Sequence, residues 1–263
     1  MNISNILQKI AAVIRIFLIM VKYMVLYPFA RPNKSKHFLK YVGKYIEKAS
    51  MHIPTVSFFE VFPEASEETV LIENLDMKLG NVSIQEAYYI AAMVKILQPK
   101  RVFEFGTFDG RTTLQMALNS PHAKIYTLDL PMDNIESILN ILPEPDEKCV
   151  LRRPQVKCFH NHSTSDMIIQ LVGDSRTFDF SPFIGRIDFV FVDGAHSMSF
   201  VKSDTENALK MVSQNGIIVW HDYARGCPGV YNVLNKLNQS LNLSHILETT
   251  LVVGNKQLSK KLR

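Results

Sequence analysis

Five short apolar runs, spread over about 120 residues, restrict the folds open to this chain more than any other feature. They are residues 101–105, 124–128, 168–172, 187–192 and 217–220. Runs of four to six residues separated by helix-like segments are typical of buried parallel strands. The pattern therefore predicts an α/β fold with a doubly wound, mostly parallel sheet.

The segments around these runs support the same fold. Ser83 and Glu86 form a capping box, which predicts a helix that ends near Leu97, before a proline. A second helix is expected over 112–119, and residues 245–248 and 250–253 suggest a closing antiparallel pair. The segment 132–166 has prolines and little periodicity, so we expect a surface excursion. We place the α/β domain at 83–263 and a connecting, acceptor-side segment at 51–82.

Residues 1–50 form a basic leader with a different character. They hold nine Lys or Arg and one acid, whereas the whole chain has a net charge of +4. Lys9, Arg15 and Lys22 interrupt the apolar stretch, so a simple membrane span is not expected. The spacing predicts a basic amphipathic helix. It could lie on an anionic membrane surface, dock on the body or mediate a homodimer.

Composition limits the compartment and the partners. Three cysteines at irregular spacing (Cys149, Cys158 and Cys227) do not make a disulfide framework or a CxxC zinc site. A cytoplasmic protein, peripheral at the inner face of a membrane if the leader binds there, is the simpler reading. A leader this apolar does not resemble a nucleic-acid-binding arm, so no nucleic-acid partner is expected.

Each of the five predicted strands has an acidic residue, a histidine or both at or just after its carboxyl end. In an open parallel sheet the carboxyl ends of the strands share one edge, where ligands bind. This edge, called the rim below, is therefore the expected site. The residues expected there are Glu104 and Gly106, Asp129, Gly173 and Asp174, Asp193 and His196, and His221 and Asp222.

The first predicted turn at the rim favours a nucleoside over a dinucleotide. Gly106 and Gly110 frame the turn, but Phe108 stands where a dinucleotide-binding GxGxxG motif has its second glycine. Asp129 follows Gly110 by 19 residues, the placement of an acid that binds ribose hydroxyls. A nicotinamide-dependent oxidoreductase on a similar sheet stays open as an alternative.

The motifs of the rim resemble those of a known family. The segments 104–113, 126–130, 173–175 and 191–197 are similar in order and spacing to class I S-adenosylmethionine-dependent methyltransferases, in the small-molecule O-methyltransferase branch. By this resemblance Glu104, Gly106 and Gly110 line the methionine end of the cofactor, with Thr112 near its carboxylate. Asp129 holds the ribose, and Asp174 and Ser175 face the adenine.

Methyl transfer to an alcohol also needs a group that removes or masks its proton. Asp193, His196 and His221 are the catalytic candidates. Metal-dependent members of the wider family use an Asp after the fourth strand and an Asp-Asn pair after the fifth. Here the pair is His221-Asp222, so Asp193, His221 and Asp222 are candidate ligands for Mg²⁺ or Mn²⁺, and a histidine base is the alternative.

The sequence thus predicts an S-adenosylmethionine-dependent O-methyltransferase that acts on a small-molecule or glycan hydroxyl. A membrane-tethered binding protein that keeps the cofactor fold without turnover is the second alternative. Two other features are assigned to structure: Trp220 to the core, and Cys158, His160 and His162 to a surface loop.

Overall fold

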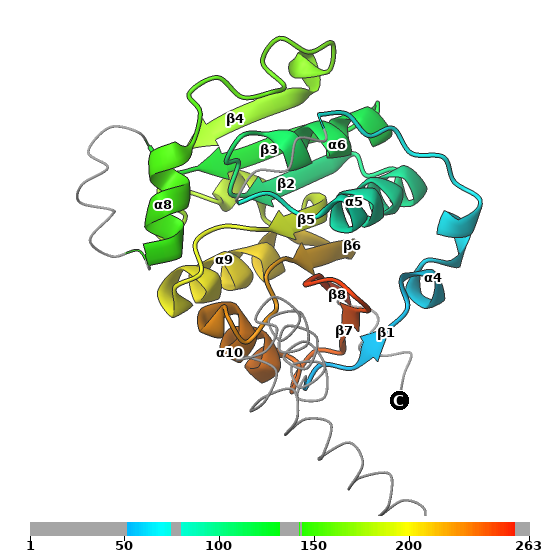
Figure 1. The fold of residues 1–263 in the computed structure, drawn as a ribbon, viewed down its shortest axis with the longest axis vertical. Helices are drawn as coiled ribbons and strands as arrows, with labels where there is room; N and C mark the ends of the chain where they lie inside the picture. The colour runs from blue at the N-terminus through cyan, green and yellow to red at the C-terminus, as the bar shows by residue number, and fades with distance from the viewer. Residues whose placement is uncertain (1–51, 75–79, 132–141, 143, 256–263) are drawn as a thin grey trace, which may run out of the picture. The chain divides into compact units, whose positions relative to one another are not determined.

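In the computed structural model, a mixed sheet with helices on both faces organises the residues described, 52–74, 80–131, 142 and 144–255 (Figure 1). The basic leader lies outside these residues. The strands are β1 (Thr55–Val56), β2 (Arg101–Phe105), β3 (Lys124–Asp129), β4 (Ile168–Val172), β5 (Ile187–Val192), β6 (Val212–Trp220), β7 (Leu243–Ile246) and β8 (Val252–Asn255). The α-helices are α4 (Phe58–Val61), α5 (Ile84–Leu97), α6 (Arg111–Asn119), α8 (Glu144–Arg152), α9 (Met198–Met211) and α10 (Pro228–Leu237). Short 3₁₀ helices span Pro63–Ser66, Ser165–Met167 and Ser181–Phe183.

The strand order confirms the predicted doubly wound sheet. It runs β1-β7-β8-β6-β5-β2-β3-β4. Strands β6, β5, β2, β3 and β4 are parallel to one another, whereas β8 pairs antiparallel with both β6 and β7. The chain moves towards one edge from β2 to β3 and towards the other from β5 to β6. Right-handed crossovers therefore place α6 and α9 on opposite faces.

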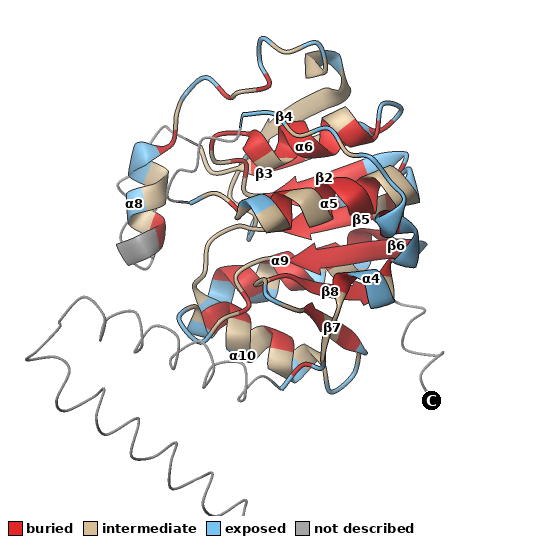
Figure 2. Ribbon diagram, turned by 45° about the vertical axis from the view of Figure 1, so that its right-hand side comes forward, coloured by how far each residue is buried: buried red, intermediate tan, exposed pale blue. Residues whose placement is uncertain are grey.

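Most predicted elements occur where the sequence suggests, because their apolar residues are buried. Helix α5 begins after Ser83, whose hydroxyl accepts from the Glu86 backbone while the Glu86 carboxylate accepts from the Ser83 backbone. The central strands are red in Figure 2, where buried residues are coloured. Trp220 is 1% exposed and donates its indole N–H to Thr205, which confirms its core position.

Two segments differ from expectation. Residues 132–166 are not only a surface excursion, because they contain helix α8. This helix has few apolar residues, so its sequence shows little periodicity. The connecting segment contributes β1, which pairs parallel with β7 and extends the sheet by one strand. Among the described helices, none has the length and apolar character needed to cross a bilayer.

The surface-loop assignment for 158–162 is consistent with the contacts there. His160 interacts with Gln170, and His162 with Thr164 and Glu73, so these two imidazoles face different partners. The three cysteines are free thiols.

Candidate active site

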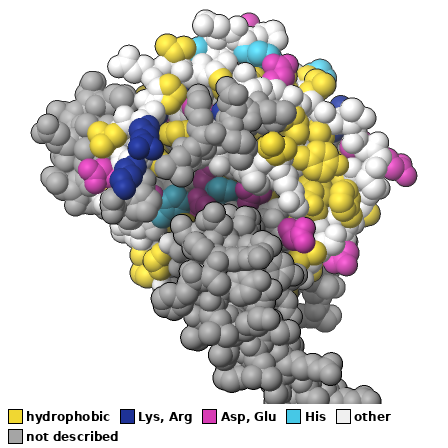
Figure 3. Space-filling model, viewed as in Figure 1, with side chains coloured by type: hydrophobic (Ala, Val, Ile, Leu, Met, Phe, Trp, Pro, Cys, Tyr) yellow, Lys and Arg dark blue, Asp and Glu magenta, His cyan; other side chains and the backbone are white. Residues whose placement is uncertain are grey.

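A cavity of about 350 Å³ lies at the predicted rim, beyond the carboxyl ends of the parallel strands. Gly106, Asp129, Gly173, Asp193 and His221 line it from five different strand ends. Helix α8 forms a further wall with Asp146, Cys149 and Val150, followed by Arg153. In the space-filling view of Figure 3, imidazole and carboxylate side chains lie at the bottom of a hollow in the visible face.

Gly106 allows the first turn to approach the neighbouring strand. Its φ is +89°, and a Cβ at this position would lie 2.0 Å from the backbone oxygen of Asp193. A side chain would therefore push β2 and β5 apart at the floor of the cavity. Phe108 also adopts a positive φ, +49°, which is strained for a non-glycine residue, and its ring lines the cavity.

Asp129 lies at the end of β3, as predicted, and is held by two cations from the α8 side. Arg153 Nη1 is 2.6 Å from its Oδ1, and Lys157 Nζ is 3.7 Å from its Oδ2. Burial raises the pKa of this carboxyl, and the two cations oppose that effect. Oδ2 is buried and has no hydrogen-bond partner among the described residues, so it can accept from a bound ligand.

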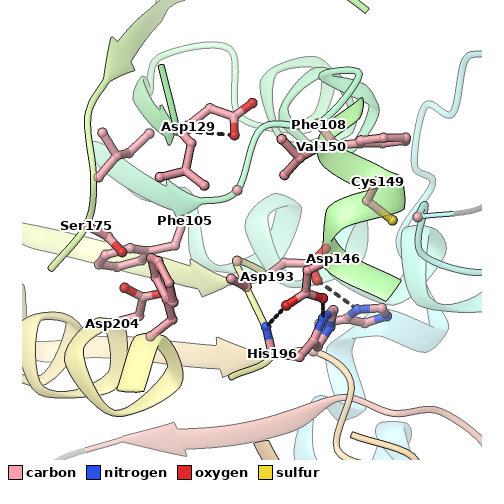
Figure 4. Close-up of a pocket in the computed structure, with 18 of the residues that line it drawn as sticks. Phe105, Phe108, Asp129, Asp146, Cys149, Val150, Ser175, Asp193, His196 and Asp204 are labelled. Atoms are coloured by element: carbon pink, nitrogen blue, oxygen red, sulfur yellow. Dashed lines mark hydrogen bonds and ion pairs between the residues drawn. The ribbon is translucent and has the colours of Figure 1, made fainter. Parts of the chain in front are cut away.

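The acceptor end of the cavity holds two histidines among four carboxylates. His221 Nδ1 lies 2.9 Å from Asp193 Oδ1 and 3.1 Å from Asp222 Oδ2, and its Nε2 lies 3.4 Å from Glu86 Oε2. His196 Nδ1 pairs with Asp146, and its Nε2 lies 2.5 Å from Asp222 Oδ2. Figure 4 shows the Asp146–His196 contact beside Asp193.

These contacts change the charge states expected of the site. Burial opposes the charged form of His196, but hydrogen bonds to Asp146 and Asp222 outweigh it and raise the pKa to about 11. Burial likewise opposes protonation of His221, and Asp193 and Asp222 raise its pKa well above the ordinary value. The pKa of Asp222 is lowered by the two imidazoles despite its burial. The ordinary pKa of histidine, near 6.5, would suit the histidine base named above as the alternative, but these carboxylates displace it.

The candidate metal ligands come together. Donor atoms of Asp193, His221 and Asp222 all lie within 4.8 Å of one another. The 2.9 and 3.1 Å separations from His221 Nδ1 match adjacent positions around an ion with bonds of about 2.1 Å. Glu86 faces the other ring nitrogen, the arrangement that commonly orients a metal-binding imidazole. The residues present therefore fit a divalent cation.

Several predicted cofactor residues lie behind the cavity wall. Among the candidates, Gly106, Asp129 and Ser175 line the cavity, but Glu104, Gly110, Thr112 and Asp174 do not. Glu104 is 1% exposed and accepts from Thr113 and Thr127, and burial raises its pKa to about 8. Asp174 accepts three hydrogen bonds from the Arg176 guanidinium.

Sequence reasoning missed part of the site. Asp146, Arg153 and Lys157 were not candidates, because they belong to the segment expected to be an excursion. Glu86 was identified only as a capping residue. For Glu86 and Asp146 no local signal exists, because their contacts with His221 and His196 span 135 and 50 residues of sequence.

Comparisons with known proteins find methyltransferases. Residues 103–223 match a family model described as a methyltransferase domain. The SAH-bound methyltransferase PaMTH1 of Podospora anserina has a TM-score of 0.50 and 16% identity, over 83% of this chain and 94% of that one. The SAM-bound O-methyltransferase TomG of Streptomyces achromogenes gives 0.44 and 17%, over 81% and 95%. An O-methyltransferase of Bacillus cereus in complex with SAH gives 0.46 and 16%, over 82% and 97%.

The first of these structures shares the fold, whereas no curated protein matches the sequence significantly. The match over residues 103–223 covers the first turn, the Asp129 strand end and the histidine cluster. Together the family match and the shared fold confirm that this chain resembles the class I S-adenosylmethionine-dependent methyltransferases, as its motifs predict.

Proposed function

We propose that this protein transfers a methyl group from S-adenosylmethionine to a hydroxyl of a small-molecule or glycan acceptor. One observation carries the proposal: a single cavity joins the ribose-type acid Asp129 to the histidine–carboxylate cluster of Asp193, His196, His221 and Asp222. Its volume of about 350 Å³ is in the range of small-ligand sites.

The cofactor half of the cavity suits a nucleoside with a cationic sulfonium. Asp129 Oδ2 is free to accept from a ribose hydroxyl, and the backbone of Gly106 lines the same cavity, where it would face the methionine portion. The carboxylates of Asp193 and Asp222 further along the cavity favour a positive charge. A sulfonium placed between Asp129 and the histidine–carboxylate cluster would direct its methyl group at the cluster.

The acceptor half suits a hydroxyl that must lose its proton. Asp193, His221 and Asp222 would hold a divalent cation, which when bound polarises the acceptor oxygen and lowers the pKa of its hydroxyl. The mixed oxygen and nitrogen donors favour Mn²⁺ over Mg²⁺. With a cation bound, His221 would be neutral: Glu86 would hold its Nε2 proton, and Nδ1 would present to the ion the lone pair that is protonated in the resting protein.

We assign His196 a positioning role in the resting protein. With a pKa of about 11 it is an imidazolium at neutral pH, so Nε2 donates to Asp222 and Nδ1 to Asp146. It thereby fixes the orientation of Asp222 and offsets charge among the carboxylates.

In the transfer step the acceptor oxygen forms a bond to the methyl carbon and the carbon–sulfur bond breaks. The hydroxyl proton passes to solvent, and S-adenosylhomocysteine is the leaving group.

Calorimetric titration of the full chain tests the proposal. S-adenosylmethionine and S-adenosylhomocysteine are titrated with and without Mg²⁺ or Mn²⁺, and NAD serves as the control. Saturable binding of the first two and no binding of NAD is the expected result. Binding of NAD alone would favour the oxidoreductase alternative, against which Phe108 in the glycine turn argues.

Turnover separates an enzyme from a tethered binding protein. If both adenosyl compounds bind but no methyl group reaches any member of a panel of phenols, catechols and sugars, the non-catalytic alternative gains. The cluster around His221 argues against it, because Asp146, Asp193, Asp222 and two imidazoles line the cavity, which is more titratable groups than the binding of a nucleoside requires.

We also propose that the basic leader brings the protein to an anionic membrane surface. Its nine Lys or Arg and interrupted apolar stretch support surface association rather than insertion. Deletion of residues 1–32 should abolish co-sedimentation with phosphatidylserine vesicles and leave cofactor affinity intact. Survival of vesicle binding would remove the leader as anchor, and a change in oligomeric state would favour the dimerisation alternative.

A further inference from the structure

Asp204 is a buried carboxylate that the proposed chemistry leaves without a role. It lies on α9, is 2% exposed and lines the cavity. In Figure 4 it lies with Ser175 at one end of the pocket, away from Asp146 and His196. Its Oδ1 is buried and has no hydrogen-bond partner among the described residues.

A buried carboxylate oxygen without a donor is costly, so this atom is suited to a ligand that supplies one. Burial raises the pKa of Asp204 to about 7, and the Ser175 hydroxyl offsets this only in part. A donor from a bound molecule would favour the ionised form and remove much of that cost.

The surroundings of Asp204 fit a flat, aromatic ligand. Phe105 and Phe200 line the same cavity. Gly194 lies directly beside the carboxylate, since a Cβ at that position would be 2.9 Å from Asp204 Oδ2. The absence of a side chain there lets Asp204 reach the cavity from a neighbouring helix.

Asp174, the acid that the family resemblance assigns to the adenine, is committed elsewhere. Both of its carboxylate oxygens accept from the Arg176 side chain, and Oδ1 also accepts from the Arg176 backbone N–H. It does not line the cavity, although its neighbours Gly173 and Ser175 do. Asp174 has the sequence position of an adenine ligand, but its side chain binds Arg176 and does not line the cavity.

We propose that Asp204 binds the adenine of the cofactor by accepting a hydrogen bond from the exocyclic amine, in place of Asp174. The inference rests on the proposed function and deepens it. Ser175, in the turn after β4, lines the same end of the cavity. The adenine would therefore be bound jointly by the turn after β4 and by helix α9.

The first test needs no variant. The wild-type chain is titrated with S-adenosylhomocysteine and with S-inosylhomocysteine, in which a carbonyl oxygen replaces the amine. Asp204 would then face an acceptor, so we expect the inosyl compound to bind at least tenfold more weakly. Equal affinities would overturn the inference and leave the proposed function standing. Binding of neither compound would overturn both.

Two variants then assign the effect to a residue. Asp204→Asn should weaken binding of the adenosyl compound about tenfold and improve binding of the inosyl compound, because an amide offers both an acceptor and a donor. Asp174→Asn is the matched control and should leave both affinities within about twofold. If Asp174→Asn removes the discrimination and Asp204→Asn does not, Asp174 is the adenine ligand and the inference is wrong.

Discussion

The cavity has two walls that reach their positions in different ways. On the rim side, Gly106, Asp129, Asp193 and His221 follow the ends of buried strands, and their places are set by the register of the sheet. On the α8 side, Asp146 and Arg153 belong to a polar helix that no strand fixes. The comparison shows that the sheet determines where chemistry can occur, whereas side-chain pairs across the cavity determine which charges are available there.

Those pairs join the two walls at both ends of the cavity. Asp146 of α8 binds His196, and Arg153 after α8 binds Asp129. Each contact uses a residue that the proposed reaction needs on the rim. The α8 side therefore contributes to the electrostatics of the rim, and mutations on the two walls should have different consequences.

The largest effect is expected on the rim. Asp222→Asn removes the carboxylate shared by His196 and His221 and should lower kcat by about 100-fold or more, with the affinity for S-adenosylhomocysteine within about threefold. Methyl transfer is measured with a labelled cofactor. Asp166→Asn, at an exposed position, is the control. A variant with full activity would place the acceptor end elsewhere.

On the α8 side we expect a loss of stability. Arg153→Gln leaves the buried Asp129 carboxylate without its closest cation, which should cost about 3 kcal/mol of unfolding free energy. Denaturant unfolding measures it, and the exposed neighbour Arg152→Gln is the matched control. If both variants unfold alike, the Arg153–Asp129 pair does not hold the two walls together.

Glu104 shows whether a place at a strand end implies contact with ligand. Its pKa is raised from 4.5 to about 8, chiefly by burial, so the unfolded chain ionises first as the pH rises. Below pH 4.5 Glu104 is protonated in both states and does not lower the free energy of unfolding. Between pH 4.5 and 8 the free energy of unfolding falls, because only the unfolded chain ionises. Glu104→Gln should therefore stabilise the protein on the order of 3 kcal/mol at pH 7.5 and change little at pH 4.5.

The measurement for Glu104→Gln is thermal unfolding at the two pH values. Because Glu104 does not line the cavity, cofactor affinity should stay within about threefold of the wild type. A large loss of affinity with no pH-dependent gain in stability would show that Glu104 contacts the ligand after all.

The smallest effect is expected at Asp129, where the two walls meet. Asp129→Ala should weaken binding of S-adenosylmethionine by about 1 to 3 kcal/mol, the amount expected for a lost charged hydrogen bond. Calorimetry measures it, and Asp179→Ala, at a turn that does not line the cavity, is the control. Unchanged affinity would place the ribose elsewhere.

The sheet and the rim could be predicted because their signals are local. Short apolar runs give the strands, and parallel strands bring their carboxyl ends together whatever the side chains are. The helix starting after Ser83 is likewise specified by four consecutive residues.

Side-chain direction and long-range contacts could not be predicted in this way. Glu104 and Asp174 occupy the expected backbone positions, yet one points into the core and the other towards Arg176. The local sequence around Asp204 gives no indication that this carboxylate is buried beside Ser175. Helix α8 has too few apolar residues for its pattern to be distinguished from a loop.

Glu86 joins three parts of the molecule that lie far apart in sequence. Its carboxylate accepts from the Ser83 backbone at the start of α5, from the backbone and hydroxyl of Thr250 before β8, and from His221. One side chain thus serves helix initiation, the closing hairpin and the orientation of the imidazole. Natural selection on folding and natural selection on activity therefore both act on Glu86. A substitution here would change the stability of the protein and the orientation of His221 together.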